Sequence, residues 1–169
     1  MEVGSYAHRP ILHRVEEIPS NEEAALSPTE MPFTPDDFDQ QMEEAIELME
    51  FLGDGEIKYA INGLLSLTPD ANPVLGPTVE VENLWSAAAV WIKEGPGVGR
   101  LVAEWMTDGY PHFTDPHGAD IARFYPHQRN VHHIEARCDE HFNKTYGIVH
   151  PREQWASRRG VTVGPVKAR

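Results

Sequence analysis

Apolar residues recur at helical spacing in three stretches of the chain, with polar residues between them. One face of the first stretch carries Phe38, Met42, Ala45, Ile46 and Met49. Thr34 is placed to cap this stretch, Pro35 suits the first helical position, and Gly53 follows the last apolar residue. These signals predict an amphipathic helix that packs against a sheet.

The other two periodic stretches lie in the second half of the chain. One side of the earlier stretch carries Val98, Leu101, Val102, Trp105 and Met106. The later one runs from about Gln128 to Tyr146, and its apolar positions are Val131, Ile134, Cys138 and Phe142. Gly147 is suited to end it. We expect a helix at each.

Short apolar runs predict strands at Ile57–Ile61 and Leu84–Trp91, and the second is apolar enough to be buried on both faces. Residues 69–73, Pro-Asp-Ala-Asn-Pro, have the composition of a turn. Val3–Leu12 is expected to be extended, and the proline-containing stretch 16–35 to be a loop.

Composition excludes several classes of protein. The 169 residues include 27 acidic and 14 basic side chains, and this net charge of -13 argues against nucleic-acid binding. Hydrophobic residues make up 40% of the chain, which is enough for a folded core. The sequence has no run of 18 apolar residues, so it predicts no membrane-spanning helix. Its one cysteine excludes an internal disulfide. We expect a cytoplasmic protein, or a mitochondrial-matrix protein in a eukaryote.

Gly95-Pro96-Gly97-Val98-Gly99 follows the second apolar run and precedes a helix. Such a segment can present backbone N–H groups and the positive helix end to a phosphate, a carboxylate or the edge of a flavin. Its spacing differs from the dinucleotide fingerprint G-x-G-x-x-G, and it lacks the P-loop ending. A tight turn that packs helix on strand is the structural alternative.

Histidines cluster near the third helix, at positions 127, 132, 133 and 141. His133 and Cys138 are five residues apart, which does not give the shared i, i+4 face of a helical metal site. We therefore predict no metal site, and a zinc-binding protein is the weakest functional alternative. Cys138 falls in the apolar stripe and is predicted to be a small core residue.

Three ordered segments together resemble the dimethylglycine/sarcosine dehydrogenase family. They are Asn62–Gly76 (NGLLSLTPDANPVLG), Leu84–Ile92 (LWSAAAVWI) and Gly97–Arg100 (GVGR). Asp120–Pro126 (DIARFYP) and Tyr146–Pro151 (YGIVHP) are similar to the start of the domain that follows in that family. The resemblance implies a mixed α+β fold: the C-terminal, substrate-side part of a D-amino-acid-oxidase-type flavin domain, then the helical start of a second domain.

The resemblance also implies a domain division and a cofactor site. Residues 1–109 would belong to the FAD-dependent oxidoreductase domain, 110–119 would be a linker, and 120–169 would begin the central domain. FAD would be the cofactor, with backbone N–H groups at the helix start facing its ring. The residues implied to line the ring are Val90, Trp91, Ile92, Lys93, Glu94, Gly95, Pro96, Gly97 and Val98.

The family's activity would be oxidation of N-methylated glycines by hydride transfer to flavin. The dinucleotide-binding half of the flavin domain is missing from this sequence, and Leu65 stands near a position where some amino-acid oxidases use Arg. We therefore expect a fragment or subunit that is inactive alone, with catalytic residues unassigned. The alternative is a non-catalytic module that pairs with a chain supplying the dinucleotide-binding half.

Overall fold

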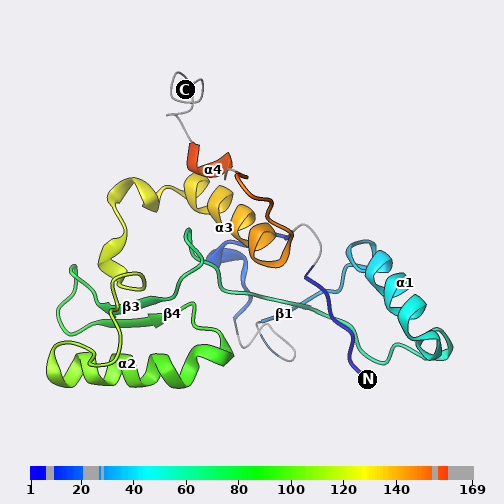
Figure 1. Cartoon of the computed structure of the whole chain (residues 1–169), viewed down its shortest axis with the longest axis horizontal. Coiled ribbons are helices and arrows are strands. Elements are labelled where there is room, and N and C mark those ends of the chain that lie inside the picture. Colours follow the sequence, from blue (N-terminus) through cyan, green and yellow to red (C-terminus); the bar gives the residue numbers. More distant parts are fainter. Residues whose placement is uncertain (7–9, 21–26, 28, 154–155, 160–169) are drawn as a thin grey trace. The chain divides into compact units, whose positions relative to one another are not determined.

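The computed structural model describes residues 1–6, 10–20, 27, 29–153 and 156–159 (Figure 1). These residues form two compact units, which are described separately. Unit 1 comprises Met1–Leu65 and Asn143–His150, and unit 2 comprises Ser66–Phe142 and the residues from Pro151. The described part of the chain contains helices and two small antiparallel sheets, which confirms the mixed α+β class.

Unit 1 contains the first predicted helix, divided into shorter pieces. A 3₁₀ turn at Pro35–Asp37 leads into α1 (Asp39–Leu48), and a second 3₁₀ turn follows at Glu50–Asp54. Pro35 occupies the predicted first position and Thr34 the N-cap position, but the Thr34 side chain makes no capping hydrogen bond. The Thr34 hydroxyl instead accepts a hydrogen bond from Asn62 Nδ2 at 2.8 Å. No residue of α1 is buried, so the expected packing against a sheet is absent from the described residues.

The strands of unit 1 lie outside the predicted run. β1 (Glu30–Met31) pairs antiparallel with β2 (Asn62–Gly63), with Glu30 opposite Gly63. The prediction of a strand at Ile57–Ile61 was wrong, and Ile57 is 67% exposed. The extended segment predicted at Val3–Leu12 forms no strand in its described residues, and its residues 7–9 lie outside them.

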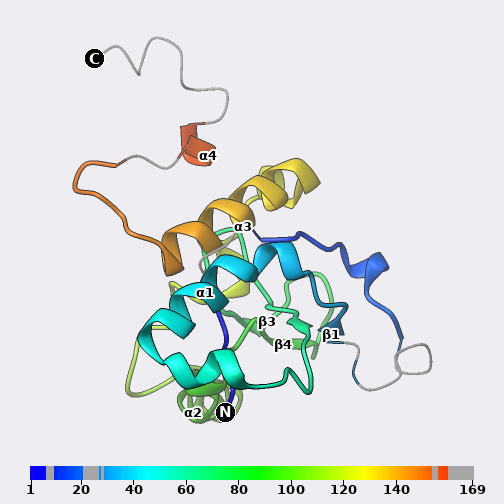
Figure 2. The ribbon, with the colours of Figure 1, turned by 90° about the vertical axis from the view of Figure 1, so that its right-hand side faces the viewer.

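Unit 2 is built around the hairpin of β3 (Val74–Pro77) and β4 (Trp85–Ala88), with α2 (Gly95–Asp108) beside it (Figures 1 and 2). Leu75 at 1% exposure is the centre of this unit's core. Gly76 has φ of +103°, and a Cβ there would lie 2.7 Å from Cη2 of Trp105. Glycine at this position lets the α2 indole pack directly on the strand backbone.

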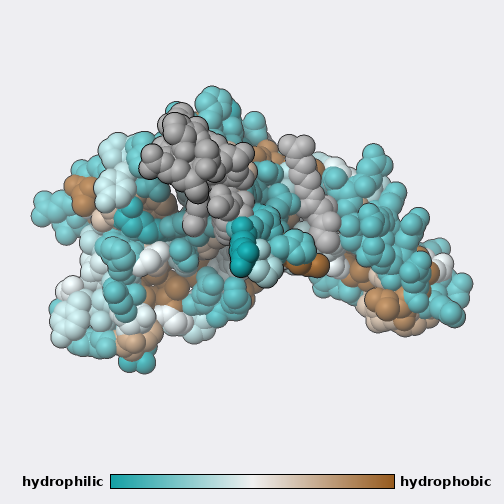
Figure 3. All heavy atoms as spheres, turned by 45° about the horizontal axis from the view of Figure 1, so that its top comes forward, coloured by the Kyte–Doolittle hydropathy of each residue, from teal (hydrophilic) through white to brown (hydrophobic). Residues whose placement is uncertain are grey.

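The predicted strand at Leu84–Trp91 is shorter and less buried than its sequence suggests. Only Trp85–Ala88 form β4, and Ala87 and Ala88 are exposed. Leu84, just before the strand, is 50% exposed. Burial on both faces was therefore a wrong expectation, because no described element covers the outer part of this strand. Figure 3 shows apolar residues at the surface among hydrophilic ones.

α3 (Val131–Tyr146) confirms the third predicted helix, and Gly147 follows its last residue. Cys138 and Phe142 are buried as the apolar stripe predicts, together with Arg137 and His141. Residues Ala156–Arg159 form the short helix α4. Residues 160–169 lie outside the described residues.

Candidate functional site

Residues 90–98 form a continuous bend from β4 into α2. Trp91 is followed by a 3₁₀ turn at Ile92–Glu94, and α2 begins directly at Gly95. The glycine segment is therefore the first turn of the helix, not a loop before it. Gly95 has φ and ψ of -49°, which any residue can adopt. Its backbone conformation therefore does not require glycine, and glycine differs from other residues here only in lacking a side chain.

The backbone donors at the start of α2 are partly used. Glu94 donates its N–H to the Trp91 carbonyl, and Gly95 donates to that of Ile92. Pro96 has no N–H, so Gly97 carries the first N–H of the helix that this 3₁₀ turn does not use. No side chain caps the helix and its first turn holds no acidic residue, but the carboxylate of the N-cap residue Glu94 lies at its positive end.

Some side chains of this bend contact one another around Trp91, and others are exposed without such contacts. Trp91 is half-buried and donates its indole N–H to the Ser66 carbonyl at 3.4 Å. Lys93 Nζ lies 4.1 Å from the centroid of the Trp91 ring and 3.3 Å from Glu94 Oε1. Glu94 Oε2 accepts the Trp91 N–H. These contacts hold both charged side chains near Trp91.

The exposed group consists of Ile92 and the first residues of α2. Ile92 is 99% exposed, and Pro96 and Gly97 are also exposed. A Cβ added at Gly95, Gly97 or Gly99 would meet nothing within 4 Å. The remaining residues, Val90 and Val98, are half-buried. The bend thus presents the exposed apolar side chain of Ile92 beside a helix start that has glycine at positions 95 and 97.

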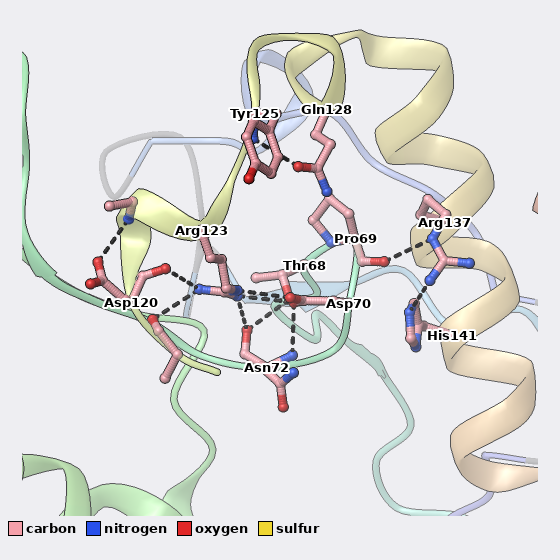
Figure 4. Close-up of polar contacts among 12 residues, drawn as sticks. Thr68, Pro69, Asp70, Asn72, Asp120, Arg123, Tyr125, Gln128, Arg137 and His141 are labelled. Atoms are coloured by element: carbon pink, nitrogen blue, oxygen red, sulfur yellow. Dashed lines mark hydrogen bonds and ion pairs between the residues drawn. The ribbon is translucent and has the colours of Figure 1, made fainter. Parts of the chain in front are cut away.

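A second group of polar residues lies in unit 2 around the turn at 68–72 (Figure 4). The Arg123 guanidinium donates to both carboxylate oxygens of Asp70, from Nε at 2.7 Å and from Nη2 at 2.9 Å. It also donates to the carbonyls of Ala119, Asp120 and Asn72. The Arg123 side chain is only 10% exposed. The paired hydrogen bonds to Asp70 have the fork geometry of a guanidinium group, which lysine cannot reproduce.

Asp70 is held as a carboxylate by this arrangement. Burial raises the pKa of Asp70, but hydrogen bonds from Arg123, Asn72 and Thr68 outweigh burial, so its pKa lies below the ordinary value. Asp70 Oδ1 also accepts from the backbone N–H of Asn72 at 3.2 Å. The turn predicted at 69–73 is therefore present, and its geometry depends on an ionised side chain.

A buried arginine on α3 contacts the same turn from another direction. Arg137 is 4% exposed and donates from Nε to the Pro69 carbonyl at 3.0 Å. Its Nη1 donates to Ser157 Oγ of α4. Its Nη2 lies 2.6 Å from His141 Nε2 (Figure 4). Glu140 Oε2 lies 3.5 Å from Arg137 Nη1, which offsets the buried charge.

Unit 2 also has an open cavity of about 540 Å³ beside these residues. Its wall is mostly apolar and includes Val74, Ile121, Phe124 and Ile134. Glu80 and Arg129 also line it and form an exposed ion pair. None of residues 90–98 lines this cavity, so it is separate from the predicted flavin-facing segment.

The histidine-rich region does not assemble metal ligands. In the part of the chain that the structure describes, no three His, Cys, Asp or Glu side chains could hold a metal ion. The rings of His127 and His133 are 6.0 Å apart, and burial, then the charges of Arg137 and His127, lower the pKa of His133. Cys138 is buried, and burial raises its pKa to about 11, as fits a core residue.

Asp70, Arg123 and Arg137 were not among the residues predicted for the site. The first two lie inside quoted motifs, but they are 53 residues apart in the sequence and no spacing rule pairs them. The sequence signal that could have found them is the presence of charged residues in these motifs: Asp70 in residues 62–76, and Asp120 and Arg123 in residues 120–126.

Comparison with known proteins gives two matches that follow one another along the chain. A family described as "FAD dependent oxidoreductase" matches residues 10–105. The "FAD dependent oxidoreductase central domain" matches residues 108–163.

Curated relatives match at modest identity. The 4-methylaminobutanoate oxidase (formaldehyde-forming) of Paenarthrobacter nicotinovorans is 34% identical over 99% of this chain and 20% of its own length. Human mitochondrial sarcosine dehydrogenase is 31% identical over 76% of the chain and 14% of its own. Mouse mitochondrial dimethylglycine dehydrogenase is 26% identical over 70% and 14%. The chain thus spans a fifth or less of these relatives. No helix among the described residues is long and apolar enough to cross a membrane.

Proposed function

Because the chain belongs to the FAD-dependent oxidoreductase family, we propose that it forms the ring-facing part of a flavoenzyme that oxidises N-methylated amino acids. The names of its relatives support this substrate class, since each acts on an N-methylated amine that carries a carboxylate. FAD would supply the oxidant, accepting a hydride from the carbon next to nitrogen and leaving an imine that water hydrolyses.

The glycines at the start of α2 carry the proposal. Glycine in a helix costs about 1 kcal/mol relative to alanine. Gly95 and Gly97 have open space around them, so no contact within the described chain requires a missing side chain there. A ligand that lies close to the backbone would account for small residues there, and 99%-exposed Ile92 lies beside it. In this arrangement residues 90–98 line the ring, and the helix start faces its electron-rich edge.

The wider assignment follows the family matches. Residues 1–109 would be the later part of the flavin domain, with a substrate-side layer formed by the region from Val3 to the α1 helix. Residues 110–119 would link it to the central domain that begins at 120. The dinucleotide-binding half would come from further chain of the same protein or from a partner chain.

A non-catalytic role is the second candidate, and the exposure of β4 favours it. Ala87, Ala88 and Leu84 present apolar surface at a strand that no described element covers on its outer side. A separate flavin-binding subunit would cover this surface and hold FAD itself. Flavin binding by the purified chain separates the two candidates.

The test is a titration of the chain with FAD, followed by quenching of flavin fluorescence and by shifts of the visible bands. We expect saturable binding at micromolar concentration. Gly97→Ala should weaken it at least tenfold, because a methyl group would project from the helix start. Gly99→Ala is the matched control: it has the same open surroundings but lies about 200° around the helix. It should bind FAD as the unchanged chain does.

Two results would contradict the proposal. If no binding is seen at high protein concentration, this chain does not bind FAD by itself. That result would favour the non-catalytic role beside a separate flavin-binding subunit. Equal affinity of the Gly97→Ala and Gly99→Ala variants would place the ring elsewhere. With FAD bound, anaerobic bleaching by sarcosine, dimethylglycine or 4-methylaminobutanoate would identify the substrate.

A further inference from the structure

The segment at 119–123 is joined to the β3 strand and to the turn before it. Leu75 donates its N–H to the Ala119 carbonyl at 2.8 Å, and Leu75 forms a parallel bridge with Asp120. Arg123 then reaches back to Asp70 with two hydrogen bonds (Figure 4). The segment therefore holds both the first part of the strand and the turn that leads into it.

The turn at 68–72 depends on the same carboxylate. Asp70 Oδ1 accepts from the Thr68 hydroxyl at 3.1 Å and from the Asn72 N–H. Ala71, between them, has φ of +60°, a conformation that costs free energy for a residue with a side chain. The Arg123 guanidinium also binds the Asn72 carbonyl, so it holds the turn on both sides of Ala71.

Both ends of this turn lead to the proposed flavin-facing segment. On one side the chain continues into β3, where Val74 pairs with Ala88 of β4 and Ser86 Oγ donates to the Val74 carbonyl at 2.8 Å. On the other side Ser66 accepts the indole N–H of Trp91. A displacement of the turn would therefore move residues 88–91 through two separate connections.

We propose that Arg123 is a positioning residue: through Asp70 it fixes the turn at 68–72 and thereby the placement of Trp91 and the start of α2. Asp70 lies in the part matching the FAD dependent oxidoreductase family, and Arg123 lies in the part matching its central domain. The pair therefore joins the two matched parts at a partly buried contact. Describing residues 90–98 as flavin-facing rests on the proposed function, whereas the coupling itself does not.

The experiment records the indole and backbone N–H signals of the whole chain by ¹⁵N NMR without FAD. Arg123→Lys keeps the charge but not the forked contact, and Asp70→Asn keeps the shape but not the charge. In both, we expect the Trp91 indole signal and the Leu75 amide signal to shift and their hydrogen exchange to accelerate at least tenfold. Trp91→Phe assigns the indole signal.

Arg129→Lys is the matched control, because Arg129 belongs to the same part of the chain and pairs with Glu80 at an exposed position. It should leave the Trp91 and Leu75 signals unchanged. Unchanged signals in Arg123→Lys and Asp70→Asn would overturn the proposal. Equal loss of the Trp85, Trp91 and Trp105 signals would also overturn it, because the pair would then support the whole unit without a specific effect on Trp91. A failed FAD titration would leave this result intact.

Discussion

Cys138 illustrates how burial sets the reactivity of a single residue. It is 7% exposed, its Sγ lies 3.6 Å from the Leu67 carbonyl, and burial raises its pKa to about 11. We predict that iodoacetamide alkylates the native chain at pH 8 at least about a hundredfold more slowly than the unfolded chain, because only the thiolate reacts. Mass spectrometry over time, with a guanidinium-unfolded control, measures both rates. Comparable rates would mean that the thiol is accessible.

Gly76 is a second residue whose surroundings fix its identity. Its φ of +103° disfavours a side chain, and a Cβ would overlap the Trp105 ring at 2.7 Å. Gly76→Ala should therefore reduce the free energy of unfolding by about 1–3 kcal/mol. Gly118→Ala, where a Cβ would meet nothing within 4 Å, is the control. Urea unfolding followed by tryptophan fluorescence compares them, and equal stability of the two variants would exclude the clash.

At the scale of elements, the sequence predicted helices far better than strands. The helices around Met42, Leu101 and Cys138 were found because their periodicity and their stop signals are local. The Ile57–Ile61 run has suitable residues but pairs with no strand among the described residues, whereas Asn62–Gly63 pair with Glu30–Met31 despite poor strand propensity. Strand pairing depends on distant residues, so a local pattern cannot predict it.

One carboxylate of α3 makes several of the contacts that dock α4, beside the hydrogen bond from Arg137 to Ser157. Glu140 accepts hydrogen bonds from the backbone N–H groups of Ala156 and Ser157 and from the Ser157 hydroxyl. Glu140→Ala should therefore accelerate hydrogen exchange of these two amides at least tenfold, because a four-residue helix has little stability of its own. Glu135→Ala, on the same helix, is the control. Unchanged exchange in Glu140→Ala would show that other contacts hold α4.

For the whole molecule, the family could be identified from the sequence and the polar network could not. The motifs around Pro69, Trp91 and Tyr125 identified the family because their order along the chain is specific. The Asp70–Arg123 pair requires the folded chain, since 53 residues separate its members. The placement of FAD against residues 90–98 stays a prediction, because it rests on the family resemblance and on no contact that the described residues make.

The same pair should govern how acid affects unit 2 as a whole. The folded-state pKa of Asp70 lies below its ordinary value: burial raises it, but Arg123 and the turn lower it further. The carboxylate therefore stabilises the fold above the unfolded-state pKa of about 4, and this contribution is lost as pH falls through the lower folded-state pKa. We predict that Asp70→Asn is less stable than the unchanged chain at pH 7, and that the difference shrinks as pH falls below about 4. Urea unfolding at each pH, followed by tryptophan fluorescence, measures it, with Asp115→Asn as an exposed control. A difference that stays constant over this range would show that ionisation of Asp70 does not stabilise the unit.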